Sequence, residues 1–191
     1  MIKELLRKTT HLAGFFIPLI YIVLDKSTMI FIAGAFVGIA VIVEFLKWVS
    51  ESFRELFFRF FKFILRRHER KGAITGATYY IISTFLCIVI FDRNIAIVSI
   101  FFIVLGDTAA ALVGKAWGRI KLIGRKSLEG SAACFVVCAL ISLFWLNPII
   151  GIIGAFVATL AELLPMRIDD NLTMPIISGA VMQLMVTYMS L

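Results

Sequence analysis

Charged residues are scarce in this sequence. Asp, Glu, Lys and Arg make up 16% of the 191 residues, whereas apolar residues make up 61%, and the mean hydropathy is +1.02. A water-soluble domain needs a polar exterior and has no place for so much apolar surface. The composition therefore excludes an ordinary soluble domain and predicts a protein whose solvent is the lipid bilayer.

Cysteine and histidine are also rare, with three and two copies. Cys87 falls in one apolar run, Cys134 and Cys138 share another, and none stands at metal-ligand spacing from a histidine. These counts exclude a disulfide framework and a zinc site, and they favour packing roles for the three thiols. A Walker A loop is absent as well, so a nucleotide site would have to be built another way.

The amino-terminal stretch lacks a cleavage signal. Lys3, Arg7 and Lys8 precede an apolar run, as in a secretory signal, but no small-x-small pattern follows that run. We therefore expect a retained first helix. The whole chain, 1–191, is expected to form one all-α, polytopic membrane domain of about seven transmembrane helices. The predicted spans are Thr9–Leu24, Met29–Leu46, Ala73–Phe91, Asn94–Leu112, Ser131–Leu146, Ile149–Leu164 and Thr173–Tyr188.

The net charge of +7 comes from residues that cluster between the apolar runs. With a cytoplasmic amino terminus, all of the 19 Lys and Arg except Lys26 and Arg93 fall on the inner side. This asymmetry predicts an integral membrane protein with its active site on the cytoplasmic side, and no nucleic-acid partner. The segment Trp48–Arg70 places apolar and charged residues on opposite arcs, which predicts one amphipathic helix in the cytoplasmic interface.

Ionisable residues inside apolar spans are candidates for function, because charge is costly in lipid. His11, Glu44, Asp107 and Glu162 all fall near predicted cytoplasmic ends and can converge on one site. Asp107 is followed by small residues on nearly the same helical face: Ala110, Gly114 and Gly118. This pattern fits either a carboxylate beside a close backbone approach or ordinary helix packing in which Asp107 pairs with a cation.

Two further polar clusters border these spans. Past Gly118, a predicted cytoplasmic loop carries four basic residues punctuated by Gly124 and Gly130, namely Arg119, Lys121, Arg125 and Lys126. Cations with exposed glycine amides suit a polyphosphate, although a solvated positive loop has the same composition. The second cluster joins Glu162 to a polar turn of Asp169, Asp170 and Asn171. Its oxygens suit magnesium, or Asp169 caps the last helix.

Taken together, these motifs resemble the CTP-dependent lipid-alcohol kinases, the family of dolichol kinase, phytol kinase and the CTP-using diacylglycerol kinase, which is related to CDP-diacylglycerol synthases. The matching residues run from end to end of the chain: Arg7-Lys8-x-x-His11; Glu69 and Gly72; Asp107-x-x-Ala110-x-x-x-Gly114-x-x-x-Gly118 with Lys121, Lys126 and Gly130; and Glu162 with Asp169-Asp170-Asn171-Leu172-Thr173-x-Pro175.

The resemblance implies transfer of the CTP γ-phosphate to the hydroxyl of a membrane lipid alcohol, with Mg²⁺. It makes Asp107 and Asp170 the expected catalytic residues. The expected nucleotide-binding residues are Arg7, Lys8, His11, Gly114, Gly118, Lys121, Lys126 and Gly130. The expected metal ligands are Asp107, Glu162, Asp169 and Asn171.

Two other functions fit the same sequence. A CDP-lipid synthase would use a similar site, but the longer acidic and glycine-rich signature of those enzymes is missing. A transporter or a small structural membrane protein would explain the spans, yet the outer half of each span is nearly uncharged. No polar path therefore crosses the membrane, which argues against transport.

Overall fold

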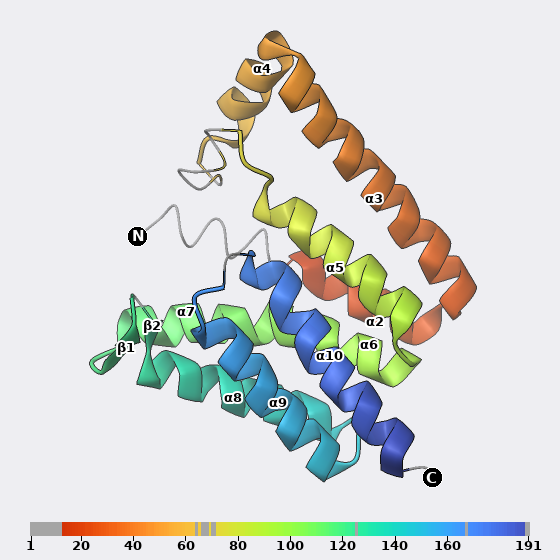
Figure 1. The fold of residues 1–191 in the computed structure, drawn as a ribbon, viewed down its shortest axis with the longest axis vertical. Coiled ribbons are helices and arrows are strands. Elements are labelled where there is room, and N and C mark those ends of the chain that lie inside the picture. The colour runs from red at the N-terminus through yellow and green to blue at the C-terminus, as the bar shows by residue number, and fades with distance from the viewer. Residues whose placement is uncertain are drawn as a thin grey trace.

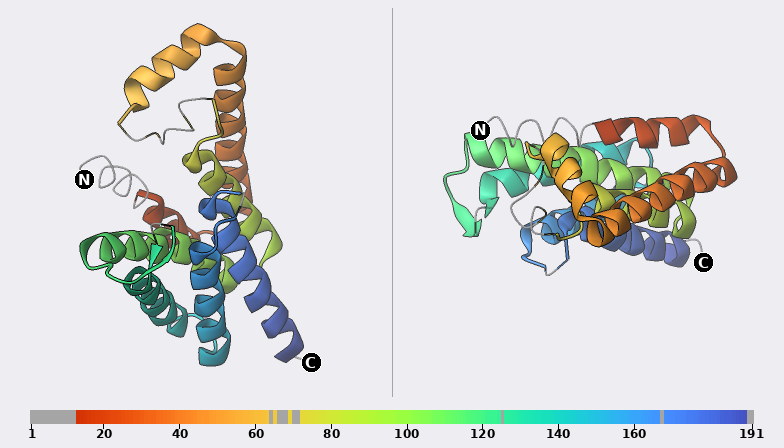
Figure 2. Two further views of the ribbon diagram at one scale, coloured as in Figure 1. Left: turned by 60° about the vertical axis from the view of Figure 1, so that its left-hand side comes forward. Right: turned by 90° about the horizontal axis from the view of Figure 1, so that it is seen from above.

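The computed structural model describes residues 13–63, 65, 69, 72–124, 126–166 and 168–189, and these residues are almost entirely helical. The elements, in chain order, are a short 3-10 turn η1 (Ala13–Phe15), α2 (Phe16–Val23), α3 (Lys26–Val49), α4 (Glu51–Phe61), α5 (Gly76–Ile90), α6 (Arg93–Phe101), a π-helical turn η3 (Phe102–Gly106), α7 (Asp107–Ala116), β1 (Lys121–Ile123), β2 (Lys126–Ser127), α8 (Leu128–Leu143), α9 (Pro148–Leu163) and α10 (Asp170–Met189). The helices pack side by side, apart from an arm formed by α3 and α4 (Figures 1 and 2).

In the described part of the chain, seven apolar helices occupy the predicted spans. Three are long and apolar enough to cross a bilayer: α3, the continuous helix Arg93–Ala116, and α10. Four shorter ones have 10 to 17 residues. The described chain therefore has the helical composition of an integral membrane protein.

The centre of the molecule is the helix made by α6, η3 and α7. In its most apolar window 72% of the residues are buried, compared with 17% in α3. Ile97, Val98, Phe102 and Ile103 are fully buried. Helices α2, α5, α8, α9 and α10 pack against this element. In contrast, α3 packs mainly along α5 and keeps Phe31 and Phe45 exposed. Lipid is the natural contact for that outer face.

Two local predictions need correction. The expected amphipathic helix Trp48–Arg70 is shorter, because α3 continues to Val49 and the Ser50 hydroxyl then caps α4 by accepting from the Phe53 amide at 3.2 Å. The helix ends at Phe61, while Arg66 and Arg70 lie outside the described residues. The predicted basic loop is in part a hairpin, since β1 and β2 pair antiparallel around Gly124, whose φ is +59°. That left-handed conformation is easy for glycine, which favours the tight turn. The fold is therefore helical with one small two-stranded sheet.

Candidate active site

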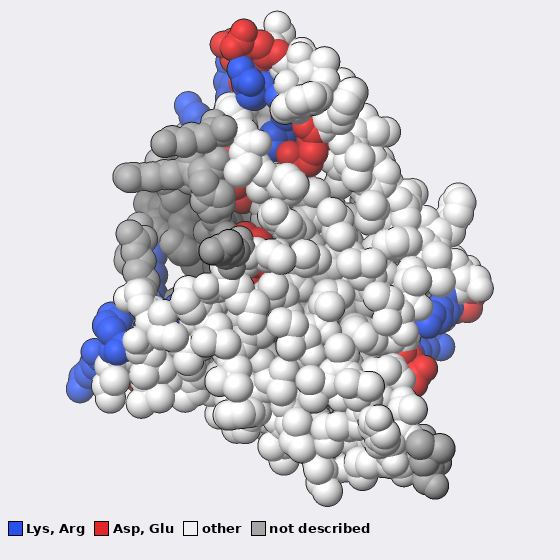
Figure 3. Space-filling view, viewed as in Figure 1, with Lys and Arg blue, Asp and Glu red and all other residues white. Residues whose placement is uncertain are grey.

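Charged side chains gather at opposite edges of the molecule, with an uncharged band between them on the face shown in Figure 3. Helix α10 connects the two edges, from Asp170 at its first residue to Gln183, whose side chain bonds Asp92. Thirteen residues of helix span about 20 Å. We call the edge that contains Asp107, Lys126, Glu162 and Asp170 the Lys126 end.

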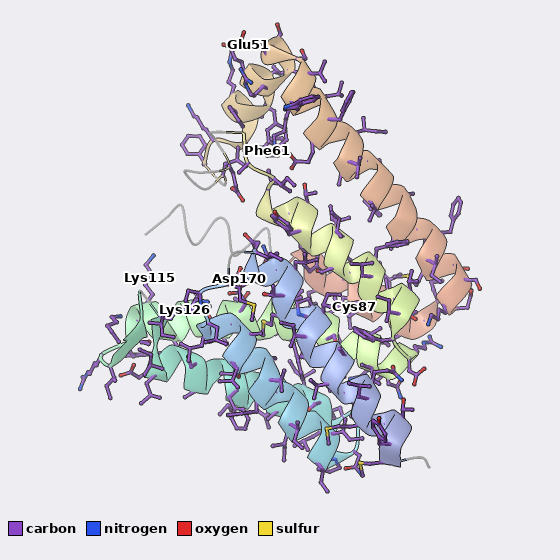
Figure 4. All side chains as sticks on the ribbon, in the orientation of Figure 1. Glu51, Phe61, Cys87, Lys115, Lys126 and Asp170 are labelled. Carbon is purple, nitrogen blue, oxygen red and sulfur yellow. The ribbon has the colours of Figure 1, made fainter. Side chains whose placement is uncertain are left out.

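The Lys126 ammonium is the hub of this end. It lies 3.1 Å from a Glu162 carboxylate oxygen and 3.8 Å from one of Asp170. Glu162 is 7% exposed in its side chain, whereas Lys126 and Asp170 are 31% and 26% exposed. Figure 4 shows Lys126 and the start of α10 on neighbouring elements. These ion pairs thus connect three elements that are separated in sequence: β2, α9 and α10.

Asp107 belongs to the same group. Its charge, like that of Asp170, is close enough to repel Glu162. Asp107 begins α7 directly after the π turn η3. A π turn shifts every following residue around the helix axis and is frequent at functional sites. Of the four residues expected to converge, Asp107 and Glu162 therefore lie close enough to interact, and Asp170 joins them, whereas His11 lies outside the described residues.

The small residues of α7 have a packing role. A Cβ atom at Gly130 would stand 2.7 Å from the Ala110 carbonyl oxygen and 3.1 Å from the Gly114 Cα atom. A Cβ atom at Gly118 would collide with the Gly114 carbonyl oxygen and meet the Ser127 hydroxyl. These three glycines let α7 and α8 approach closely, which carries the hairpin with Lys126 to the carboxylates. Their expected contact with nucleotide stays a prediction.

Asn171 and Pro175 fix the start of α10. The Asn171 side-chain amide donates to the Gly76 carbonyl at 3.1 Å. Pro175 has no N–H to give to the Asn171 carbonyl four residues earlier, and the Ser83 hydroxyl fills that place at 2.8 Å. Asp170 is thereby held on the first turn of a helix that is bonded to α5.

Asp169 accepts a hydrogen bond from the Asn171 amide at 3.1 Å, so it caps α10. This arrangement matches the capping alternative, and a metal-binding role for Asp169 remains a prediction. Among the described residues, no group of three or more His, Cys, Asp and Glu has the spacing to hold a metal ion by itself.

Glu44, a half-buried acid, serves α5. Its carboxylate accepts from the Thr75 amide at 3.0 Å and the Thr78 hydroxyl at 2.8 Å, and it pairs with Lys47 at 2.6 Å. Glu69 adds a bond from the Gly76 amide at 2.7 Å. Asn171 bonds the same residue, Gly76, so the start of α5 links Glu44 and Glu69 to the start of α10. Glu44 thus supports the Lys126 end structurally and makes no contact with the Lys126 ammonium.

Two residues that sequence reasoning missed shape the hairpin. Ser127 caps α8 by accepting from the Gly130 amide at 3.2 Å. Glu129 accepts from the Arg119 and Ile120 amides at 3.0 and 3.2 Å. A Ser followed by an acid before an apolar run was the available signal for this helix start.

The remaining expected residues fall in two groups. Lys121 is exposed on β1, paired in register with Ser127. Arg7, Lys8 and His11 lie outside the described residues, as does Arg125. The structure therefore brings together Asp107, Lys126, Glu162 and Asp170, keeps Lys121 on the same hairpin, and leaves the amino-terminal cluster untested.

Comparison with known proteins gives a consistent set of relatives. No family model matches the sequence, and no solved structure matches it significantly. An uncharacterized protein of Rickettsia prowazekii is 29% identical over 181 residues, covering 89% of this chain and 88% of that protein. CTP-dependent diacylglycerol kinase 1 of Schizosaccharomyces pombe is 32% identical over 144 residues, covering 63% of this chain and 64% of the kinase.

A probable chloroplastic phytol kinase of Triticum aestivum is 32% identical over 136 residues, covering 60% of this chain and 45% of that protein. The matched segment thus spans about half to two thirds of each named kinase. The resemblance expected from the motifs is confirmed: this chain is a distant relative of the CTP-dependent diacylglycerol kinases and of a phytol kinase.

Proposed function

We propose that this chain is a membrane-embedded kinase that transfers the γ-phosphate of CTP to the hydroxyl of a lipid or isoprenoid alcohol, of the phytol, polyprenol or diacylglycerol type. One observation carries the proposal. A distant relative of CTP-dependent lipid kinases gathers a lysine and three carboxylates from separate elements at one end of its helices. Charged groups on membrane-embedded helices are costly, so several of them gathered at one place indicate a functional site.

The proposed orientation has all seven apolar helices crossing the bilayer, with the Lys126 end and the amino terminus in the cytoplasm. The four shorter helices would cross with local thinning or with flanking residues that reach the interface. Exposed Phe60 and Phe61 on α4, together with Arg59, support an interfacial position for that helix. A nucleotide would then reach the site from water and the alcohol from lipid.

Nucleotide binding is assigned to the hairpin and the amino terminus. Lys121 and Lys126 would contact phosphates through single ammonium groups. Arg7, Lys8 and His11 would add charge from the amino-terminal segment. The close approach at Gly114, Gly118 and Gly130 would keep the hairpin over α7. Phosphoryl transfer needs mainly positioning and charge neutralisation, which such a set supplies.

The carboxylates fit Mg²⁺ in their chemistry. Magnesium in kinases is usually held by one or two carboxylates together with substrate phosphates, so a complete protein cage is not required. Asp107 and Glu162 would hold it, with Asp169 and Asn171 at the border of the site, and it would neutralise the polyphosphate. The catalytic carboxylates are Asp107 and Asp170, of which one would accept the proton of the lipid hydroxyl.

The proposal is tested by the fate of each phosphate. Purified protein in detergent is incubated with Mg²⁺, either a lipid alcohol or the corresponding lipid phosphate, and CTP labelled at either the α- or the γ-phosphate. A kinase transfers only the γ label to lipid and releases CDP. Transfer of the α label to a lipid phosphate, with release of pyrophosphate, would mark a CDP-lipid synthase. No transfer to phytol, polyprenol or diacylglycerol under any condition would contradict the enzyme assignment.

A further inference from the structure

Lys126 supplies a positive charge beside the carboxylates of Glu162 and Asp170. Glu162 is nearly buried, and its charge is repelled by Asp107 and Asp170. A buried carboxylate without a compensating cation is strongly unfavourable. The Lys126 ammonium, 3.1 Å from Glu162 and 3.8 Å from Asp170, compensates part of this negative charge in the nucleotide-free protein.

The same position suits a divalent cation. Two carboxylates from α9 and α10 face one point of positive charge, and Mg²⁺ or Mn²⁺ would be attracted by the same pair. An ammonium keeps oxygens at hydrogen-bond distance, whereas Mg²⁺ requires them at about 2.1 Å. The distances from Lys126 Nζ to the two carboxylates therefore suit an ammonium and are too long for Mg²⁺. This agrees with the lack of a ready metal cluster among the described residues.

Lys126 is also able to leave. Its side chain is 31% exposed, and a lysine ammonium sits on a flexible four-carbon stem. It belongs to the two-residue strand β2, next to the turn at Gly124. When a polyphosphate binds together with a divalent metal, the phosphate can become the new partner of this ammonium. The metal then replaces the ammonium as the partner of the two carboxylates.

We propose that Lys126 occupies the cation position between Glu162 and Asp170 in the nucleotide-free protein and leaves it for a phosphate when a divalent cation enters. This inference rests on the proposed function for the identity of the phosphate, while the exchange of ammonium for metal concerns this chain alone. The exchange delays metal loading until nucleotide is present, because metal and ammonium compete for the same carboxylates.

The test measures Mn²⁺ binding to the full chain in detergent, without nucleotide, from the electron paramagnetic resonance signal of free Mn²⁺. Lys126→Met keeps the side-chain length and removes the competing charge, so it should bind Mn²⁺ roughly tenfold more tightly than wild type. Lys115→Met removes an exposed charge from neighbouring α7 and should bind as wild type does. Equal affinity in wild type and Lys126→Met, or the same gain in Lys115→Met, would overturn the exchange.

A second measurement uses the unaltered protein and so does not depend on how the variant folds. Acylation of lysines by a water-soluble reagent, quantified by mass spectrometry, should increase at Lys126 as Mn²⁺ is added and stay constant at Lys115. Constant labelling of Lys126 at saturating Mn²⁺ would contradict release. If both tests succeed while CTP transfers no phosphate, the cation exchange stands and the kinase proposal fails. If transfer occurs without either effect, only the exchange fails.

Discussion

The two ends of the helices use their charges differently. At the end opposite Lys126, which we call the Arg93 end, the Arg93 guanidinium donates to the carbonyls of Tyr21, Ile22 and Leu24 at 2.7 to 3.3 Å. Lys26 donates to the Phe91 carbonyl at 2.9 Å. These cations complete the carboxyl ends of α2 and α5, where helices leave carbonyls without partners.

At the Lys126 end, in contrast, the ammonium of Lys126 and the carboxylates of Glu162 and Asp170 face one another across three elements. Some acids at this end do cap helices, as Glu44 and Glu69 do for α5. The facing group goes beyond capping and brings charges together at a cost in desolvation. The comparison teaches that charge at the Arg93 end serves folding, whereas part of the charge at the Lys126 end goes beyond folding and is available for the proposed chemistry.

The largest expected effect that would sharpen this comparison is at Asp107. Asp107→Asn keeps the side-chain volume and removes the charge available to a metal or a proton, so we expect phosphoryl transfer from CTP to fall about 10³-fold. The melting temperature should stay near that of wild type. Transfer and thermal unfolding are measured on one detergent preparation. Clear destabilisation with normal turnover per folded molecule would move Asp107 out of the site.

The next effect concerns the approach of α7 and α8. Gly130→Ala would press a methyl group against the Ala110 carbonyl and the Gly114 backbone, and we expect a loss of about 1–3 kcal/mol in unfolding free energy. The matched control is Gly38→Ala in α3, where nothing lies within 4 Å of the added atom. The control should be neutral or slightly stabilising. Similar losses in both variants would refute the packing account.

A smaller loss is expected from Arg93→Ala at the opposite end. Removing the guanidinium deprives three carbonyls of their donor, which should lower the unfolding free energy by about 1–2 kcal/mol. Turnover per folded molecule should not change, because the proposed reacting groups lie at the Lys126 end. Arg93→Lys keeps the charge but loses the planar set of donors, so its unfolding free energy should lie between those of wild type and Arg93→Ala. Loss of turnover in well-folded Arg93→Ala would break the division between the ends.

The smallest effect is the pH dependence of the α3 cap. Hydrogen bonds from the Thr28 amide and hydroxyl lower the pKa of Asp25 below its ordinary 3.8. A group with a lowered folded-state pKa stabilises the fold above its unfolded pKa and loses that contribution as pH falls through the folded value. Asp25→Ala should therefore melt below wild type at neutral pH and converge with it below pH 3.8. A difference independent of pH would exclude this cap.

Much of the architecture was predictable, because long apolar runs and the distribution of Lys and Arg are strong signals. The π turn before Asp107 was not predictable, since nothing in Phe102–Gly106 marks a change of helical pitch. The break at Ser50 was also missed, although a serine before an acid is a capping signal. The apolar pattern of the segment continues through this residue and hides the boundary.

For the site, sequence placed the acids near one level of the membrane but could not pair them. Lys126 and Lys121 look alike in the loop, and only the hairpin register turns Lys126 toward Glu162 while Lys121 stays exposed. The neighbours of Asn171 make it an expected metal ligand, which stays a prediction, but they give no sign that its side-chain amide bonds Gly76, 95 residues away. Contacts at such separation leave no local pattern in a single sequence.

The central claim, that nucleotide binds at the Lys126 end, is tested most directly by protection from alkylation. Leu122→Cys and Ser27→Cys place single exposed thiols on β1 and beside Lys26 at the Arg93 end, while Cys87, Cys134 and Cys138 are buried. With CTP and Mg²⁺, the account predicts slower alkylation of the thiol at position 122 and an unchanged rate at position 27. Protection at position 27, with none at position 122, would contradict it.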